Sequence, residues 1–442
     1  MNKKSVLIVP SNDASLSELI KFSSLAEGRS FEPVFYIPFA TNFVKVIEGK
    51  GWEIIYNKNK NGKNSQVKSW LKYVAKNFFD NTNLGVFVQT HLLKNTLSKS
   101  LVENIKRQSD LIGNIIVEKK ISTCLLATDR SVGAEAAVAY FSKNYDLKKI
   151  VVSFAYSADY VSSYKLRNSK IYLARYKGCQ DNEYVDSSLG RKLFFRPYEQ
   201  KALSMLGLFP KKPWVLGGGY SDLMIVDSLR EKNRLVDLGG QTDKYVVTGT
   251  SSHDHLYEAY NQKEKLKKSV NSDYFNEERQ LLIISLPQYY EHGLCSKVKH
   301  FAIIDSMLSE VTSLGYNILV SLHPKMDPQN YKYLETKFDL SIATQELSKI
   351  IAAADMFLAT YSSTITWALM CRVPVVIFDY IALDYDDFYS EFSIPIGKTN
   401  EDVIEHLKNS NCILKPEFDR KIAMLSPFDG NCFERVLGSI SE

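Results

Sequence analysis

Short apolar runs alternate with longer segments of helical spacing along the first 250 residues of the chain. SVLIVP (5–10), EPVFYIP (32–38) and STCLLAT (122–128) are typical of buried strands, and LSELIKFSSLAEG (16–28) has the spacing of an amphipathic helix. A Lys-rich helical pattern runs from about Val67 to Lys119. This alternation predicts a doubly wound domain built on a parallel sheet.

A second alternating half begins at Leu281, and three of its predicted strands stop at polar residues. The strands are NILVSL (317–322), MFLAT (356–360) and VPVVIFD (373–379). The polar residues at their ends are His323, Pro324 and Lys325, then Ser362, Ser363 and Thr364, and last Asp379. In an open parallel sheet ligands bind outside the carboxyl ends of the strands, so we expect a ligand site here.

Each of these polar groups also has an ordinary structural interpretation. The hydroxyls at 362–364 precede a predicted helix, where they either bind a phosphate or act as an N-cap. His323 is either a ligand contact or a core histidine, and Lys325 is either a phosphate contact or a solvated loop residue. Asp379 can be a turn residue. Gln288, His292 and Gly293 stand in a predicted strand-to-helix loop and are further candidates for the same site.

The order of HP, YSST and a strand that begins with Pro resembles the C-terminal domain of GT-B glycosyltransferases. The likeness is closest to bacterial enzymes that use CMP-activated sugars, which are sialyltransferases, polysialyltransferases and capsule Kdo transferases. It implies that His323 contacts the cytidine monophosphate group and that Ser362 with Ser363 binds the donor phosphate. Weaker likenesses lie at KYVVTGTSSHDHLY (244–257) and SPFDGNCFERV (426–436). The acidic (D/E)-(D/E)-G motif of several sialyltransferases is missing from the chain.

The resemblance and the alternation together predict an α/β GT-B fold, in which two doubly wound Rossmann-like domains face each other across a cleft. The expected divisions are an N-terminal acceptor-side domain at 1–255 with a basic and aromatic insertion at about 160–212, a linker at 256–278, a C-terminal donor domain at 279–425, and a closing helix at 426–442 that packs back on the N-terminal domain.

Glycosyl transfer benefits from a group that removes the proton of the acceptor hydroxyl. We expect this base in the N-terminal half, where acidic residues follow predicted strands. Asp129 ranks first because the adjacent Arg130 favours its ionised form. Asp13 ranks second and Glu135 third, and each of the three can instead be a helix cap or a first-turn acid.

Composition limits the protein class and its compartment. The chain has 442 residues, 45% hydrophobic and 24% charged, as in a soluble globular protein of two domains. Its first apolar run is too short for a signal peptide, and no run approaches the ~20 residues of a spanning helix. The six cysteines form no CxxC pair, and the histidines lack metal-site spacing. We therefore expect a cytoplasmic protein without a metal or a cofactor.

The insertion at 160–212 is basic and aromatic. It has eleven Lys and Arg against four Asp and Glu, a net charge of +7 where the whole chain has +5. Either its aromatic residues pack inward, or the segment contacts an anionic membrane surface or a lipid-linked acceptor. Nucleic acid ranks last among the partners, because the donor-type motifs lie in the other half.

Three functions remain open on the sequence. The first is a metal-independent glycosyltransferase of capsule or lipopolysaccharide synthesis, which moves a sugar from a CMP-linked nonulosonic or octulosonic acid donor to a surface-glycan acceptor. The second is a UDP-sugar transferase or an enzyme like UDP-GlcNAc 2-epimerase. The third is a non-catalytic subunit of polysaccharide assembly.

Overall fold

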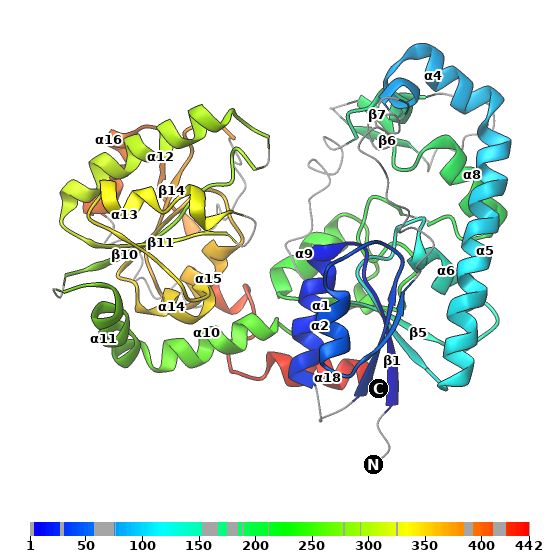
Figure 1. Ribbon diagram of the computed structural model, residues 1–442, viewed down its shortest axis with the longest axis horizontal. Coiled ribbons are helices and arrows are strands. Elements are labelled where there is room, and N and C mark those ends of the chain that lie inside the picture. Colours follow the sequence, from blue (N-terminus) through cyan, green and yellow to red (C-terminus); the bar gives the residue numbers. More distant parts are fainter. Residues whose placement is uncertain are drawn as a thin grey trace. The chain divides into compact units, whose positions relative to one another are not determined.

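The protein forms two compact α/β units (Figure 1). The computed structural model describes residues 4–26, 31–56, 75, 77–152, 167–174, 184–187, 190–210, 212–276, 279–291, 293–323, 326–383, 392–409 and 421–441. Unit 1 comprises Met1–Val226, Glu231–Val247 and Val436–Glu442, and unit 2 comprises Asp227–Arg230 and Thr248–Arg435.

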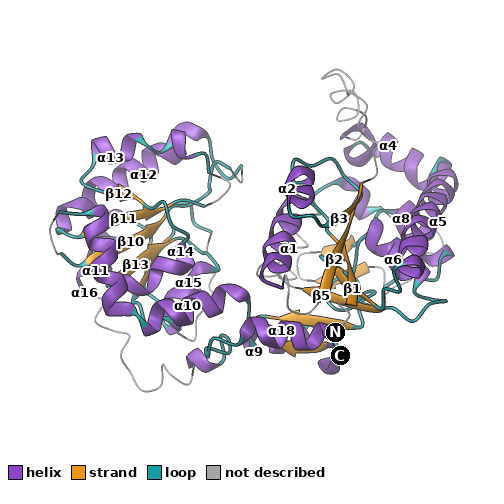
Figure 2. Ribbon diagram, turned by 60° about the horizontal axis from the view of Figure 1, so that its bottom comes forward, coloured by secondary structure: helices purple, strands orange, loops and turns teal. Residues whose placement is uncertain are grey.

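Unit 1 is built on a parallel sheet with the strand order β3-β2-β1-β4-β5-β8-β9. The strands are β1 Lys4–Val9, β2 Phe31–Ile37, β3 Glu53–Tyr56, β4 Thr123–Leu126, β5 Lys148–Val152, β8 Leu223–Val226 and β9 Tyr245–Val247. Successive residues of β1, such as Leu7 and Ile8, are both fully buried, since helices cover both faces of the sheet (Figure 2).

The remaining elements of unit 1 are α1 Asp13–Ala26, α2 Val44–Gly49, α4 Asn83–Phe87, the π-helix η2 Val88–Leu92, α5 Lys94–Glu118, α6 Ala134–Phe141, the 3-10 turn η3 Lys170–Leu173, the antiparallel strands β6 Tyr184–Ser187 and β7 Gly190–Leu193, α8 Pro197–Met205, α9 Leu229–Asp237 and the 3-10 turn η5 Thr242–Lys244. The long helix α5 packs on α6. At Gly113 the packing is so close that a Cβ would lie 2.4 Å from the Phe141 ring.

Unit 2 has its own parallel sheet with the order β12-β11-β10-β13-β14-β15. The strands are β10 Leu281–Ser285, β11 Asn317–Ser321, β12 Ser341–Ile342, β13 Met356–Ala359, β14 Val375–Phe378 and β15 Ile396–Gly397. Leu281 and Ile283 of β10 belong to the hydrophobic core on one face, and Leu282 and Ile284 belong to the core on the other.

The helices of unit 2 are α10 Ser251–Asn261, α11 Lys263–Tyr274, α12 Lys297–Val311, η6 Thr312–Leu314, η7 Pro328–Asn330, α13 Tyr333–Lys337, α14 Leu347–Ile350, η8 Ile351–Ala353, α15 Thr364–Met370 and α16 Asn400–Asn409. The helix α18, Cys432–Ser441, begins in unit 2, and its residues from Val436 onward belong to unit 1. The predicted linker at 256–278 coincides with most of α10 and α11, which are part of unit 2.

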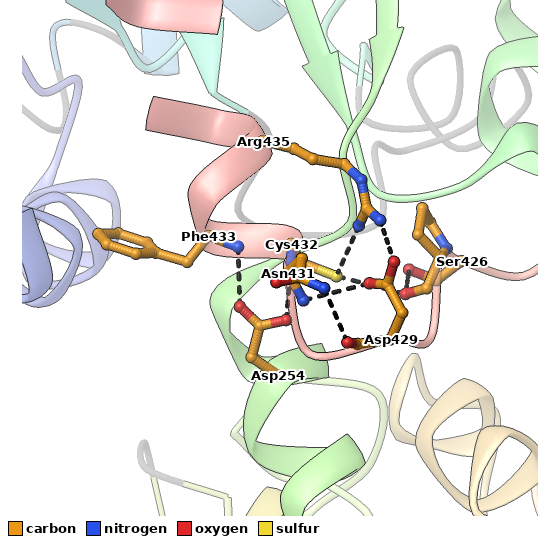
Figure 3. A network of polar contacts seen from close by, with 8 residues as sticks. Asp254, Ser426, Asp429, Asn431, Cys432, Phe433 and Arg435 are labelled. Carbon is orange, nitrogen blue, oxygen red and sulfur yellow. Dashed lines mark hydrogen bonds and ion pairs between the residues drawn. The ribbon is translucent and has the colours of Figure 1, made fainter. Parts of the chain in front are cut away.

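A network of polar contacts joins α10 to the start of α18 (Figure 3). The Asp254 carboxylate accepts hydrogen bonds from the backbone N–H groups of Cys432 and Phe433, both at 2.8 Å. Arg435 forms an ion pair with Asp429 in the preceding turn. Because the first N–H groups of a helix have no partner within the helix, Asp254 satisfies two of them and places a negative charge at the positive end of the dipole.

The structure confirms the predicted fold class, because each half forms a doubly wound parallel sheet covered by helices. The predicted strands at 5–10, 32–38 and 122–128 correspond to β1, β2 and β4. Helix α2 and strand β8 are additions to the pattern expected from the sequence.

Candidate functional site

The sheet of unit 2 changes its winding direction between β10 and β13. β10 pairs with β11 on one side and with β13 on the other, so the loops that leave the carboxyl ends of β10 and β13 run in opposite directions. Such a switch point leaves a crevice at the carboxyl edge of a parallel sheet, where ligands bind. The residues at this point are Gln288 and Tyr289 after β10, and Thr360 to Thr364 after β13.

Hydroxyl and amide groups meet at this switch point. The Tyr289 hydroxyl donates to Thr360 Oγ1 at 3.3 Å and thereby links the two strand ends. Ser362 Oγ lies 2.9 Å from Thr364 Oγ1 and accepts from the Thr364 N–H at 3.2 Å. The buried Oε1 atom of Gln288 has no hydrogen-bond partner in the structure. A buried acceptor without a partner is costly, so its position at a switch point favours a ligand group as the partner.

The other described candidate residues of unit 2 lie in separate loops of the structure. His323 is exposed after β11, where its backbone N–H points at Met326 Sδ at 3.3 Å, so it is not a core histidine. Ser363 is also exposed, and its side chain makes no cap hydrogen bond to α15. Gly293 has a φ of +69° in the loop after β10. His292, Pro324 and Lys325 lie outside the described residues.

Asp379, at the end of β14, is almost completely buried. Its Oδ1 accepts from the backbone N–H of Leu383 at 2.9 Å. This contact is the turn role that the sequence left open for it.

Unit 1 has a switch point of the same kind between β1 and β4. β1 pairs with β2 and with β4, and the loops after β1 and β4 bring together Ser11, Ser131 and Glu135. The Ser11 hydroxyl donates to Glu135 Oε1 at 2.5 Å, and the Ser131 hydroxyl donates to Glu135 Oε2. Glu135 is 3% exposed and stands in the first turn of α6.

The environment of Glu135 makes its carboxyl group less acidic than usual. Burial raises the pKa of Glu135, and the hydrogen bonds from Ser11 and Ser131 oppose that rise in part. A carboxyl group with a raised pKa at a switch point is a candidate for proton transfer.

Asp129 has a different environment, because its carboxylate is hydrogen-bonded to the glycine-rich loop at 217–219. Oδ2 accepts from the Gly219 N–H and from the Ser221 hydroxyl, both at 2.9 Å, and the residue is 0% exposed. A Cβ at Gly219 would lie 1.8 Å from the backbone oxygen of Asp129, so only glycine fits there. Asp129 thus anchors a loop, whereas Asp13 is exposed at the first position of α1.

The described part of the 160–212 insertion carries aromatic rings that are packed inward. Phe194 and Phe195 are 8% and 5% exposed, and the Phe194 ring lies 5.1 Å from the Trp214 ring. The Arg167 guanidinium stacks over Phe194 at 3.7 Å. Burial lowers the pKa of Arg167 to about 10, so it is still charged at neutral pH.

Sequence reasoning missed several residues of the two switch points. Ser11 follows the first predicted strand directly, so its position was visible in the sequence. Ser131 is only four residues before Glu135, and its serine carried no distinct motif. Tyr289 joins the site through Thr360, 71 residues later. Within the described ranges no group of three or more His, Cys, Asp or Glu side chains is placed to hold a metal ion. None of the helices in that part of the chain combines the length and apolar character that a bilayer span requires.

The fold is similar to that of several solved proteins. The UDP-GlcNAc 2-epimerase of Neisseria meningitidis, solved with bound UDP-GlcNAc, superimposes with a TM-score of 0.51 at 13% identity, covering 98% of this chain and 99% of the other. A glycosyltransferase of Rickettsia africae gives a TM-score of 0.51 at 13% identity, with 100% and 98% covered. The wall teichoic acid polymerase TagF gives 0.50 at 12% identity, with 99% and 88% covered.

These neighbours have GT-B-like folds, and at this level of identity they establish the fold of the chain. No family model matches the sequence, and no curated protein matches it.

Proposed function

We propose that the protein is a glycosyltransferase that takes a sugar from a nucleotide-activated donor and transfers it to a surface-glycan acceptor. The observation that carries this proposal is the group of hydroxyls and the unpartnered Gln288 Oε1 at the switch point of unit 2. Hydroxyl groups next to a helix start suit a phosphate, and a free acceptor suits a sugar hydroxyl or a base amino group.

The donor in this proposal is CMP-linked, and His323, Ser362 and Ser363 contact its cytidine monophosphate part. His323 and Ser363 are both exposed, so both side chains are accessible to a ligand. Thr364, Gln288 and Gly293 complete the described donor residues of unit 2. His292, Pro324 and Lys325 stay in the proposal on the sequence alone.

Glu135 takes the role of the base, in preference to Asp129 and Asp13. In the transfer step the acceptor hydroxyl oxygen forms a bond to the anomeric carbon, and its proton moves to Glu135. The bond between the anomeric carbon and the phosphate oxygen breaks, and the nucleotide leaves with the electron pair. A base that has a raised pKa is a better proton acceptor than an ordinary carboxylate.

The protein supplies hydroxyls and backbone N–H groups to the leaving phosphate, so the proposed reaction needs no divalent ion. The test is transfer from CMP-linked donors in the presence of EDTA, compared between the wild type and a Ser362→Ala/Ser363→Ala double variant. We expect activity in EDTA and a loss of about tenfold or more in donor affinity in the variant. The matched control is Ser309→Ala/Ser313→Ala on and after α12, which should leave both unchanged.

A UDP-sugar enzyme like the 2-epimerases is the second candidate. It is favoured by the full-length match to the Neisseria meningitidis enzyme, in which 99% of that chain is covered. An epimerase acts on the nucleotide-sugar itself and requires no acceptor. Incubating the protein with UDP-GlcNAc alone therefore separates the two functions, since only an epimerase converts that donor without a glycan.

A further inference from the structure

The continuous helical segment formed by α4 and η2 is oriented with its apolar side outward. Leu84, Phe87 and Leu92 are 63%, 52% and 63% exposed, whereas Gly85 and Gln89 are buried. A surface helix of a globular protein normally buries its apolar residues and exposes its polar ones. The reversed arrangement indicates that the outward side meets an apolar environment.

Specific contacts hold the segment in this orientation. Gln89 Nε2 donates to the backbone oxygen of Phe79 at 2.8 Å and to Asp80 Oδ1 at 3.3 Å. A Cβ at Gly85 would lie 2.3 Å from the backbone oxygen of Phe78, so the helix packs directly on the preceding turn. The inward-facing Gln89 is thus hydrogen-bonded, and a rotation of the helix about its axis would break both of its hydrogen bonds.

Two neighbouring residues extend the apolar surface. Phe78 is 42% exposed in the helical stretch 77–81 on which α4 packs, and Leu173 of η3 is 52% exposed. Lys170 of η3 donates to Asn83 Oδ1 at 3.2 Å, so η3 lies against α4. The α4 face is defined here as Phe78, Leu84, Phe87, Leu92 and Leu173.

The sequence that flanks the α4 face is strongly basic. From Ile54 to Val102 the sequence contains eight Lys and a single acidic residue, Asp80. Asp80 is itself paired with Arg196, with 2.6 Å between Oδ2 and Nη2. This segment therefore has a large unbalanced positive charge, which attracts an anionic surface.

The α4 face lies on the side of unit 1 where substrates of such sheets bind. α5 is 25 residues long, or about 37 Å, and it leads into β4, which spans only about 13 Å. The start of α5, with η2 and α4 before it, therefore extends beyond the carboxyl edge of the sheet, as Figure 1 shows. That is the edge at which Ser11, Ser131 and Glu135 meet.

We propose that the α4 face is a docking surface for an anionic lipid bilayer, into which the exposed apolar side chains insert and to which the net positive charge of the flanking sequence is attracted. A helix with an apolar outward side and basic flanks has the chemistry of an interfacial membrane anchor. A second copy of the chain fits less well, because docking two such faces would bring two basic segments together. The proposal rests on the exposed side chains and the charge, and it is independent of the catalytic activity.

The test is co-sedimentation of the full chain with vesicles of phosphatidylcholine alone and of phosphatidylcholine mixed with phosphatidylglycerol. We expect binding to the anionic vesicles that weakens at high salt, and a partition coefficient about tenfold or more lower in Leu84→Ser/Phe87→Ser. The matched control is Val117→Ser/Val298→Ser, which removes two exposed apolar side chains, 57% and 81% exposed, outside the α4 face. The control should bind as the wild type does.

The four substituted side chains, those of Leu84, Phe87, Val117 and Val298, are all exposed. The melting temperatures of the test variant and of the control variant should therefore equal that of the wild type. Equal binding to neutral and anionic vesicles, or wild-type binding by Leu84→Ser/Phe87→Ser, overturns the proposal. So does a concentration-dependent dimer that this variant abolishes in the absence of vesicle binding, because the α4 face is then an interface between copies.

Discussion

Glu135 combines three properties that suit a catalytic base: a position at a strand switch point, hydrogen bonds that orient both carboxyl oxygens, and a raised pKa. The orientation comes from two serines on different loops. The raised pKa comes from burial. These properties were not visible in the position of Glu135 along the chain.

We expect Glu135→Gln to lower kcat by about 100-fold or more, because the amide cannot accept the acceptor proton. The donor KM should change little, since donor binding is assigned to unit 2. Wild-type kcat should fall as the pH drops through the raised pKa of Glu135, because the base must be ionised to act. Steady-state kinetics across pH measure both effects.

The control for this substitution is Asp13→Asn, which changes an exposed carboxylate at the start of α1. It should retain wild-type kcat. Wild-type kcat in Glu135→Gln, or a loss in Asp13→Asn alone, would move the base away from Glu135.

Asp129 is expected to matter for stability. Asp129→Ala removes the acceptor for Gly219 and Ser221 and leaves buried donors without partners, so it should lower the free energy of unfolding by about 2–4 kcal/mol. Urea denaturation measures this loss. An unchanged unfolding free energy together with a lost kcat would show instead that Asp129 is the base.

These two acids show how far the sequence alone can go. The sequence identified Asp129 as a strand-end acid and Glu135 as an acid one helical turn later, and it ranked Asp129 above Glu135. The contact that engages Asp129 comes from Gly219, about ninety positions later, and no local pattern reveals it. The contact between Ser11 and Glu135 joins residues that are 124 positions apart along the chain.

At the scale of elements, the buried strands were predicted well because their apolar runs are long and end in turn residues. The hydrophobic pattern did not predict the elements that are short or lack clear end signals. α2 has six residues and no side-chain cap bond, and β8 is a four-residue strand that follows a glycine-rich loop. α10 and α11 resemble a polar linker because their buried stripes are narrow, with Leu256 and Val270 the apolar residues at less than 2% exposure.

The start of α10 depends on a histidine that must stay neutral. His253 Nδ1 accepts from the Thr250 N–H at 3.3 Å and lies 2.6 Å from Ser426 Oγ. Burial lowers the pKa of His253 to about 4. In the unfolded chain the pKa is near 6.5, so below that pH the unfolded state binds the extra proton and the folded state becomes less stable.

We expect this residue alone to remove about 2 kcal/mol of unfolding free energy when the pH is lowered from about 7.5 to about 5. The loss should begin near the unfolded pKa and be complete near the folded one. Urea denaturation at the two pH values measures it as the difference between the wild type and His253→Gln. His255→Gln, on the same helix, is the control and should keep the wild-type pH dependence. An equal dependence in His253→Gln and the wild type would contradict the assignment.

At the scale of the whole molecule, each unit offers one part of the proposed reaction. Unit 2 provides hydroxyls and a free acceptor at the switch point between β10 and β13, and unit 1 provides Glu135 at the switch point between β1 and β4. The fold matches span nearly the whole chain, so both units belong to the shared fold. The proposed reaction depends most on the nature of the donor.

Isothermal titration calorimetry with CMP, CDP, UMP, UDP and GDP tests whether the donor is CMP-linked. We expect CMP to bind most tightly and His323→Ala to weaken its binding by about ten- to a hundredfold, the effect of one lost hydrogen bond to a charged group. His406→Ala, on α16, should bind CMP as the wild type does. Absence of CMP binding, tighter binding of UDP than of CMP, or wild-type affinity in His323→Ala would contradict a CMP-linked donor.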